Sequence, residues 1–352
     1  MPPSAVAAAG PATLAGGVLL APVRLPTTTL RKGTTLDLAL AAGLVKEAGA
    51  GGLSHPIRIA WPEAGDIHED AAAERLAAAA AGGGVQRLPP RQSRLDLVAE
   101  REGVLHLRTD GLTRFNAIDS LELFTLFHGQ AVRAGEVVAS VKVAPHIISG
   151  TLVDQGVQIA RQNSPLVEVR PYQPHEVAAI VAESISGDAL DRFQAGARAK
   201  VEALGSSFGT TLVISSEDPE GAERESRRAL ESLALERKLR TVLVGGVSAG
   251  DPLAPFYAAL RDLGGRVVRH GVPAHPGSMI WLAELGETQL LGLPQCGMFT
   301  LATAADLILP RLLTGERLTR ESLAQLAHGG MLTRDMRFRF PAYARNLEAP
   351  EG

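Results

Sequence analysis

The sequence contains little cysteine and no long uninterrupted run of apolar residues. Its one cysteine, Cys296, excludes an internal disulfide framework and any zinc site built on cysteine. The apolar stretch from Ala5 to Val23 has no basic start and is broken by glycine and proline, which is not typical of a signal peptide. No stretch reaches the ~20 apolar residues that a membrane span needs. We therefore expect a cytoplasmic protein that does not enter a membrane.

Aromatic residues are scarce, and neither sign of charge is in large excess. Phe, Trp and Tyr make up 4% of the chain, so the core must be built from Leu, Val, Ile and Ala. The net charge is −3 and the basic residues are scattered, which gives no electrostatic reason to expect nucleic-acid binding. A length of 352 residues with 45% hydrophobic residues is enough for two compact domains.

The pattern along the chain predicts three parts: a mixed α/β region over 1–171, an α/β domain over 172–333 and a C-terminal tail over 334–352, which we expect to be loose after Pro341. The first part contains an Ala-rich helix that ends near Ala81, followed by short β-like runs at 104–107 and 137–143. Pro171 and Pro174 mark a boundary because proline interrupts regular structure.

The second part alternates regularly between short apolar runs and longer segments with helical periodicity. Short apolar runs, typical of buried strands, occur at 177–181, 210–214, 241–244 and 289–293. Helical stripes lie between and after them, including 190–204, 217–238, 253–263 and 300–313. This order predicts a mostly parallel sheet with helices on both faces. Such sheets bind ligands outside the carboxyl ends of their strands.

The strongest local motif is the run Gly245-Gly246-Val247-Ser248-Ala249-Gly250-Asp251, between a predicted strand and a predicted helix. Glycines there let backbone N–H groups approach a ligand closely, and a helix N-terminus favours an anion. Gly245, Gly246, Ser248 and Gly250 are therefore candidate phosphate-binding residues. The ordinary alternative is a tight turn in which Asp251 caps the helix.

Two further loops border predicted strands. One contains Pro276, Gly277 and Ser278, and the other contains Pro294, Gln295, Cys296 and Gly297. Each taken alone is typical of a turn at a sheet edge. Together with the 245–251 loop they predict the walls of one pocket.

Carboxylates offer a second kind of candidate. Asp188 and Asp191 follow the first strand of the α/β domain, where they could hold Mg²⁺ or act on a phosphoanhydride; solvated charges at a helix start are the alternative. His68 with Asp66, Glu69 and Asp70 resembles a metal cluster. However, these residues precede the Ala-rich helix, and acidic residues favour the first turn of a helix.

The ordered set of motifs resembles the molybdopterin-binding domain shared by MoeA, gephyrin and Mog proteins. The matching pieces are Gly-Gly-Val-Ser-x-Gly at 245–250, Leu-Gly-Gly at 263–265, Pro-Gly at 276–277 and Gly-Leu-Pro at 292–294. Leu-Arg-Lys-Gly-Thr at 30–34 is similar to the lead-in segment of MoeA-type chains. The set 63–70, 139–145, 271–277 and 328–332 is most similar to molybdopterin-binding proteins that are sometimes fused to a nucleotidyltransferase.

This resemblance implies a protein of molybdenum-cofactor biosynthesis or delivery. Its ligand would be molybdopterin or adenylated molybdopterin. If it inserts molybdenum, it would also take molybdate and Mg²⁺, with Asp251, Asp188 and Asp191 as the acids to test. The sequence departs from the MoeA pattern where an acid is usual, since Leu253 stands there. That departure favours the alternative of a non-catalytic carrier.

The resemblance also implies partners. These are a molybdoenzyme or a molybdopterin nucleotidyltransferase, and further copies of the chain in a homo-oligomer. A third class remains open, an unrelated α/β protein that binds another phosphate-bearing ligand.

Overall fold

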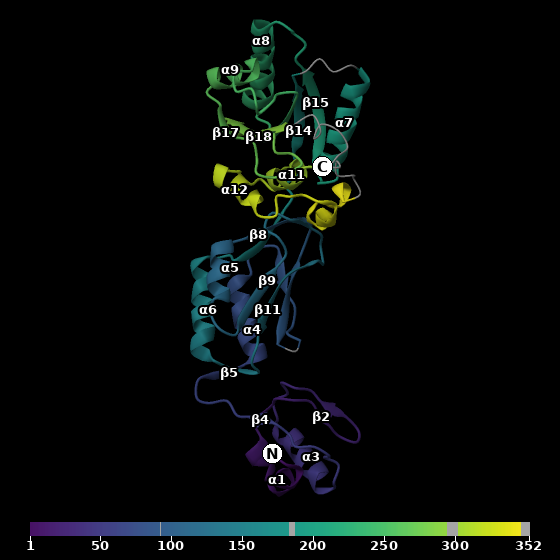
Figure 1. Ribbon diagram of the computed structural model, residues 1–352, viewed down its shortest axis with the longest axis vertical. Helices are drawn as coiled ribbons and strands as arrows, with labels where there is room; N and C mark the ends of the chain where they lie inside the picture. The colour runs from purple at the N-terminus through teal and green to yellow at the C-terminus, as the bar shows by residue number, and fades with distance from the viewer. Residues whose placement is uncertain (92, 183–186, 294–301, 346–352) are drawn as a thin grey trace. The chain divides into compact units, whose positions relative to one another are not determined.

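The computed structural model describes residues 1–91, 93–182, 187–293 and 302–345, which fall into two compact units (Figure 1). Unit 1 consists of Met1–Glu100, His106–His128 and Ala134–Val169. Unit 2 consists of Arg101–Leu105, Gly129–Arg133 and the chain from Arg170 onward. The sequence did not predict that two short segments, 101–105 and 129–133, belong with the C-terminal part. Within the described part of the chain, none of the helices is both long and apolar enough to cross a membrane.

Unit 1 begins with a small helical module around its own apolar core. Leu36 and Leu44 are fully buried in that core. Asp37 caps the longest helix of the module by accepting a hydrogen bond of 2.8 Å from Leu40 N. The elements are α1 (Pro3–Ala8), α2 (Pro11–Leu14), β1 (Val18–Leu19), β2 (Val23–Arg24), β3 (Thr29–Leu30), α3 (Leu38–Gly49) and β4 (Ile59–Ala60).

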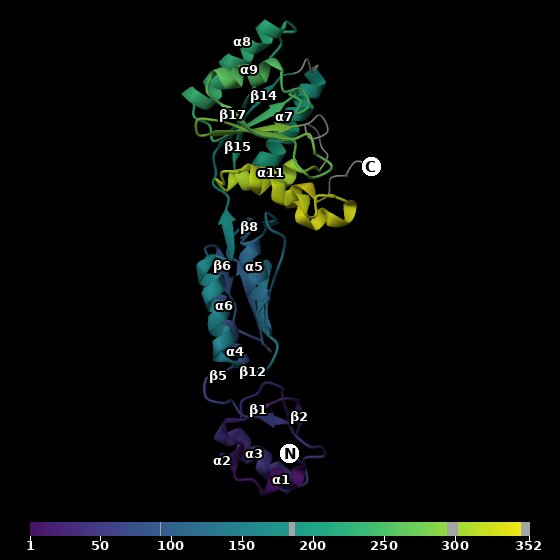
Figure 2. The same ribbon diagram turned by 60° about the vertical axis from the view of Figure 1, so that its left-hand side comes forward.

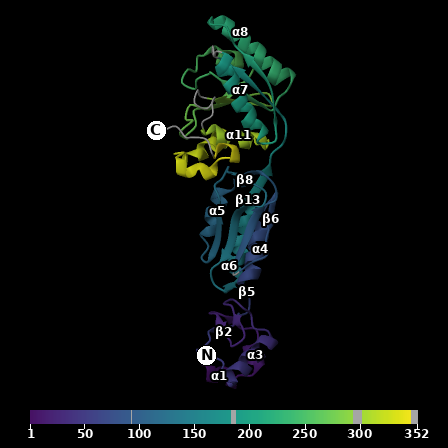
Figure 3. The same ribbon diagram turned by 90° about the vertical axis from the view of Figure 1, so that its right-hand side faces the viewer.

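The rest of unit 1 is an antiparallel sheet covered by helices. Its main sheet has the order β6-β7-β11-β9, and α4, α5 and α6 pack together and against it (Figure 3). The predicted Ala-rich helix is α4. The elements are β5 (Asp66–His68), α4 (Glu69–Ala80), β6 (Val85–Arg87), β7 (Arg94–Ala99), α5 (Thr109–Asn116), β9 (Leu121–Thr125), β11 (Val137–Val143), β12 (Ile147–Ser149) and α6 (Gly150–Gln162). Two strands, β8 (Gly103–Leu107) and β13 (Val167–Pro171), run across the boundaries of the units.

Unit 2 is built on a six-stranded sheet with the order β15-β14-β16-β19-β18-β17. Its strands are β14 (Glu176–Val181), β15 (Ser207–Val213), β16 (Thr241–Gly245), β17 (Arg266–His270), β18 (Trp281–Leu285) and β19 (Thr288–Leu293). Its helices are α7 (Gly187–Glu202), α8 (Pro219–Leu230) with a π-helical turn η1 (Glu231–Glu236), α9 (Pro255–Asp262), α11 (Ala305–Leu313) and α12 (Arg320–Ala324). Three 3-10 turns follow, η2 (Gln325–Ala327), η3 (Arg334–Arg339) and η4 (Ala342–Ala344), and β10 (Ala131–Val132) pairs with β8.

The sheet confirms the α/β class but is mixed rather than mostly parallel. Strands β15, β14, β16 and β19 are parallel neighbours, as expected from their apolar runs. Strand β18, which the sequence analysis missed, pairs antiparallel with both β19 and β17. Strands β18 and β19 are joined by the two residues Gly286 and Glu287, and Gly286 has a φ of +57°. Two-residue loops with glycine at positive φ are typical of β-hairpins, so the sequence held a signal for this pairing.

Helices cover both faces of the sheet, as predicted (Figure 2). Alternate residues of β14 separate the two cores: Val177, Ala179 and Val181 face α7 and α11, whereas Ala178 and Ile180 face α8 and α9. Phe340 and Ala344 lie in the α7–α11 core. The predicted tail is therefore packed against unit 2 as far as Ala344, which lies beyond Pro341, where we expected a loose chain.

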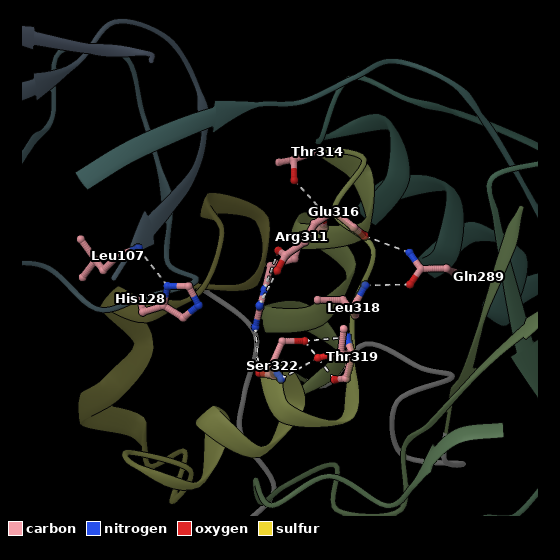
Figure 4. A network of polar contacts seen from close by, with 9 residues as sticks. All are labelled: Leu107, His128, Gln289, Arg311, Thr314, Glu316, Leu318, Thr319 and Ser322. Carbon is pink, nitrogen blue, oxygen red and sulfur yellow. Dashed lines mark hydrogen bonds and ion pairs between the residues drawn. The ribbon is translucent and has the colours of Figure 1, made fainter. Parts of the chain in front are cut away.

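A polar network fixes α11 against the start of β19 (Figure 4). Arg311 is 1% exposed and donates to both carboxylate oxygens of Glu316, over 2.9 and 2.6 Å. The side chain of Gln289 donates to Glu316 O and accepts from Leu318 N, both over 2.9 Å. Because a bidentate pair satisfies the buried guanidinium, this end of the helix has a defined position.

The residues that resembled a metal cluster are used by unit 1 itself. His68 Nε2 donates to Gly33 O over 2.8 Å, and His68 Nδ1 accepts from Asp70 N and so caps α4. The Glu69 carboxylate is 3% exposed and accepts from His146 Nδ1 over 2.9 Å. Gly33 has a φ of +79°, and a Cβ there would lie 2.3 Å from Glu69 Oε1. The capping interpretation is therefore the one that the geometry supports.

We expect His146→Ala to lower the free energy of unfolding of unit 1 by about 2 kcal/mol, because it leaves a buried carboxylate without its charge-assisted hydrogen bond. The midpoint of urea denaturation measures the change. Asp154→Asn is the matched control, since it breaks the exposed Arg75–Asp154 pair, and exposed pairs contribute about 0–1 kcal/mol. Equal effects of the two substitutions would contradict the assignment.

Candidate functional site

The carboxyl ends of the central strands of unit 2 lie at one level of the sheet. Val181 pairs with Gly245, and Gly245 pairs with Leu293. The loops that follow β16 and β17, over 246–254 and 271–280, therefore begin at the same edge. Two of the three predicted loops are brought to one edge in this way. Pro294, Gln295, Cys296 and Gly297 lie outside the described residues.

Two carbonyl groups of the loop after β16 accept hydrogen bonds from side chains of unit 2. Gly246 has a φ of +78°, which glycine adopts at little cost. The indole Nε1 of Trp281 donates to Val247 O over 2.8 Å, and the Tyr257 hydroxyl donates to Ser248 O over 3.2 Å. The N–H groups of residues 246–249 have no acceptor within the part of the chain that the structure describes. Successive N–H groups without acceptors can form a concavity that suits an anion.

The two aromatic side chains that hold this loop were missed by the sequence analysis. Trp281 and Tyr257 are 0% and 1% exposed, and their ring centroids are 5.2 Å apart. Burial, with a contribution from the charge of Asp251, raises the pKa of Tyr257, so its hydroxyl stays protonated as a donor. Gly292 pairs with Trp281, and a Cβ on Gly292 would lie 2.0 Å from the indole. The glycine of the Gly-Leu-Pro motif thus makes room for the tryptophan that positions the loop.

Ser248 stands in a Gly-x-Ser-x-Gly pentapeptide, a pattern that also occurs in the nucleophile elbow of hydrolases. In an elbow the strand passes directly into a helix at the serine. Here residues 246–254 separate β16 from α9. Ser248 is exposed, and its Oγ accepts from Gly250 N over 3.0 Å. The hydroxyl therefore shapes the loop and remains accessible to a ligand, without the geometry of an elbow.

Asp251 does not cap a helix. Helix α9 begins at Pro255 with Ala254 at its N-cap position, where no side chain makes a capping bond. Asp251 Oδ1 accepts from Leu253 N over 3.1 Å within the loop. The alternative that Asp251 caps the helix was wrong because proline, which favours the first position of a helix, sets the start later in the chain. Leu253, at the position where the MoeA pattern has an acid, is 82% exposed.

The loop after β17 forms a compact wall next to the first. Val272 N donates to Ser278 O over 3.0 Å, and Ala304 N donates to Pro276 O over 2.9 Å. Pro276 and Gly277 are buried whereas Ser278 is exposed. A Cβ on Gly250 would lie 3.3 Å from Met279 Cε, so the two loops are in contact. Predicted residues from both motifs therefore share one surface.

The predicted acids do not gather there. Asp188 and Asp191 lie on the exposed side of the first turns of α7. Among the described residues, no group of three His, Cys, Asp or Glu side chains could hold a metal ion. The described acids Asp188, Asp191 and Asp251 therefore do not form a Mg²⁺ site by themselves.

A further loop at this edge, residues 214–218, follows β15. Its sequence predicts only the start of a helix. Asp218 caps α8 by accepting from Gly221 N over 2.8 Å. The N–H groups of Ser215 and Ser216 donate to Glu225 Oε2 over 2.7 and 3.2 Å. A carboxylate of the protein thus occupies these two donors.

Comparison with known proteins gives similarity to solved structures only. No family model matches the chain, and no curated protein matches it. A MoeA protein of molybdopterin biosynthesis from Pyrococcus horikosii is 12% identical, with 74% of this chain and 80% of that chain covered and a TM-score of 0.27. The molybdopterin biosynthesis enzyme MoaB from Thermus thermophilus is 16% identical, with 40% and 97% covered and a TM-score of 0.27. A MogA structure is 15% identical, with 43% and 99% covered and a TM-score of 0.27.

At these scores and identities the chain is not assigned to a family. Its function must therefore be inferred from its own residues and their geometry.

We expect Gly277→Ala to lower the free energy of unfolding of unit 2 by about 2 kcal/mol, because a side chain at positive φ is strained. Gly277 has a φ of +110°, and the new Cβ would lie 2.8 Å from Ala304 N. Thermal denaturation measures the loss. Gly250→Ala is the control, since its Cβ would meet the flexible end of Met279 rather than backbone. If Gly277→Ala is no more destabilising than Gly250→Ala, the loop is not constrained as described.

Proposed function

We propose that the carboxyl edge of unit 2 binds the phosphate of molybdopterin or of adenylated molybdopterin. One observation carries the proposal: the carbonyls of Val247 and Ser248 are held by buried aromatic side chains, while the N–H groups of 246–249 lack acceptors among the described residues. Such a preformed set of donors suits a phosphate. The ligand class comes from the motif order 245–250, 276–277 and 292–294, which resembles molybdopterin-binding domains.

The residues divide between binding and closure of the site. Gly245, Gly246 and Gly250 let the backbone approach the phosphate, and the exposed Ser248 hydroxyl adds a donor. Ser278, with Pro276 and Gly277 behind it, forms one wall, and Pro294 to Gly297 would form another. Recognition depends mainly on backbone groups, so it needs no basic side chain to neutralise the phosphate.

The role that we favour is a binding one, in cofactor biosynthesis or delivery. Insertion of molybdenum with cleavage of an adenylate would call for acids around Mg²⁺. Leu253 replaces one such acid, and Asp251 uses one oxygen within its own loop. These two observations favour the alternative in which the protein is a carrier that binds the cofactor without inserting molybdenum. A carrier would pass the cofactor to a molybdoenzyme or receive it from a nucleotidyltransferase, and self-association into a homo-oligomer belongs to the same proposal.

The first test is titration of the purified protein with molybdopterin and with its adenylate, with Mg²⁺ and molybdate present, while release of adenylate is followed. We expect saturable binding of at least one form. Binding without release would assign a carrier, and binding with release would assign an insertase. Failure to bind either form would overturn the pterin assignment, and binding of another phosphate ester in its place would assign the third class.

We expect Tyr257→Phe to weaken this binding about fivefold, because it removes the hydrogen bond that orients Ser248 O, and such a bond contributes about 1 kcal/mol. The dissociation constant for the bound form measures the effect. Tyr172→Phe makes the same chemical change outside the loop and should leave the affinity unchanged. Equal affinities for Tyr257→Phe and the unaltered protein would contradict the role of the aromatic support.

We expect Asp251→Asn to retain ligand binding, because an amide oxygen can still accept from Leu253 N. If the protein releases adenylate, the same substitution should abolish release, since the carboxylate would hold the metal. Parallel measurements of affinity and of adenylate release separate the two effects. Release at an unchanged rate would exclude Asp251 as a metal ligand.

A further inference from the structure

An ion pair that the proposed site does not use lies in the core beside it. Lys200 Nζ on α7 is 2.9 Å from Asp306 Oδ1 on α11. The side chain of Asp306 is 0% exposed and that of Lys200 is 12% exposed. The pair borders a cavity of about 20 Å³, whose other lining includes Phe193, Ala197 and Leu293. Burial of two charges among apolar groups brings little net stability, so stability alone does not account for this pair.

Asp306 also closes the turn that precedes α11. Its Oδ2 accepts from Thr303 N over 2.9 Å and from Lys200 Nζ over 3.2 Å. Thr303 Oγ1 in turn accepts from Ala305 N over 3.2 Å. Ala304, at the N-cap position, makes no side-chain capping bond. The carboxylate of Asp306 therefore acts as a cap from inside the helix.

The turn closed by Asp306 supports the wall of the candidate site. Ala304 N donates to Pro276 O over 2.9 Å. A Cβ on Gly277 would lie 2.8 Å from Ala304 N, so the two backbones are in close contact. A shift of the 303–306 turn must therefore move Pro276 and Gly277, and Ser278 with them.

Lys200 is the group that balances the carboxylate of Asp306 and holds it in place. The buried hydroxyl of Tyr343 is close to Asp306, and burial together with the carboxylate charge raises its pKa well above the usual value. A phenol carries no positive charge in either protonation state, so Tyr343 cannot balance the carboxylate. The compensating charge comes from Lys200.

We propose that Lys200 and Asp306 are positioning residues for the ligand wall at 276–278. Through the 303–306 turn, the pair holds the loop that closes one side of the phosphate site. This proposal rests on the proposed function for its ligand, but the positioning of the loop can be measured without one.

Two double variants separate positioning from packing. Lys200→Met with Asp306→Asn removes both charges but keeps an oxygen that accepts from Thr303 N. Lys200→Met with Asp306→Leu removes the charges and the acceptor. Neutral replacement of both members of a buried ion pair is often tolerated, so the Asn variant should melt near the unaltered protein. The Leu variant also leaves Thr303 N without its acceptor and should melt lower.

We expect the Asn variant to bind the pterin ligand within about twofold of the unaltered protein and the Leu variant to bind it about tenfold more weakly, as loss of a buried hydrogen bond predicts. Hydrogen exchange at Ala304 N, which bonds to Pro276 O, should be about tenfold faster in the Leu variant alone. If the Leu variant does not fold, Lys200→Met with Asp306→Ala removes the same acceptor and takes its place.

Equal affinity and equal exchange at Ala304 in the two double variants would overturn the proposal. If the unaltered protein binds no pterin, the proposed function fails, and the exchange measurement alone decides the positioning role. Faster exchange only in the variant without the acceptor would then still support it.

Discussion

The hydrogen bond from the Trp281 indole to the carbonyl of Val247 joins strand β18, which the sequence did not predict, to the 246–250 loop of the candidate site. It requires the antiparallel strand β18, because that strand carries the indole. It also requires Gly292 on β19, because any side chain there would occupy the space of the ring. Tyr257 and Phe256 pack against the same ring, with centroid distances of 5.2 and 5.7 Å. One aromatic cluster thus holds two carbonyl groups of the 246–250 loop toward the protein.

The parallel strands and the glycine loops of unit 2 could be predicted from the sequence. Continuous apolar runs such as 177–181 and 241–244 are typical of strands that are buried on both faces, and the structure places strands there. Strand β18 was not predicted, and hydrophobic periodicity alone would not have given its antiparallel direction. The turn at Gly286 carried that information, through a backbone conformation rather than through hydrophobicity.

The site itself was predictable only in its backbone part. Glycine permits close approach to a backbone, so Gly246, Gly250 and Gly277 could be named as candidates from the sequence. Tyr257 and Trp281 did not, because their role depends on contacts between residues far apart in sequence. Asp251 was misplaced for a local reason, since Pro255 rather than the nearest acid sets the start of α9. Residues 294–297 lie outside the described residues, so their part in the site remains a prediction.

In both proposals the ligand site depends on backbone groups and on buried side chains that do not touch the ligand. The donors of the loop are peptide N–H groups, and their arrangement depends on a tryptophan, a tyrosine and a glycine at its back. The Lys200–Asp306 pair belongs to the same class of support, since it acts through the backbone of 303–306. Substitutions behind the loop should therefore matter as much as substitutions at its surface.

The order in which the chain visits its two units has a consequence for its synthesis. Residues 101–105 and 129–133 belong to unit 2 but emerge between segments of unit 1. They are made well before the strands of the six-stranded sheet, which begin at Glu176. Unit 2 therefore cannot be completed from its C-terminal stretch alone, and a polypeptide that started at Arg170 would lack two of its segments. In genetic terms, neither unit is a contiguous cassette that could be exchanged as a block.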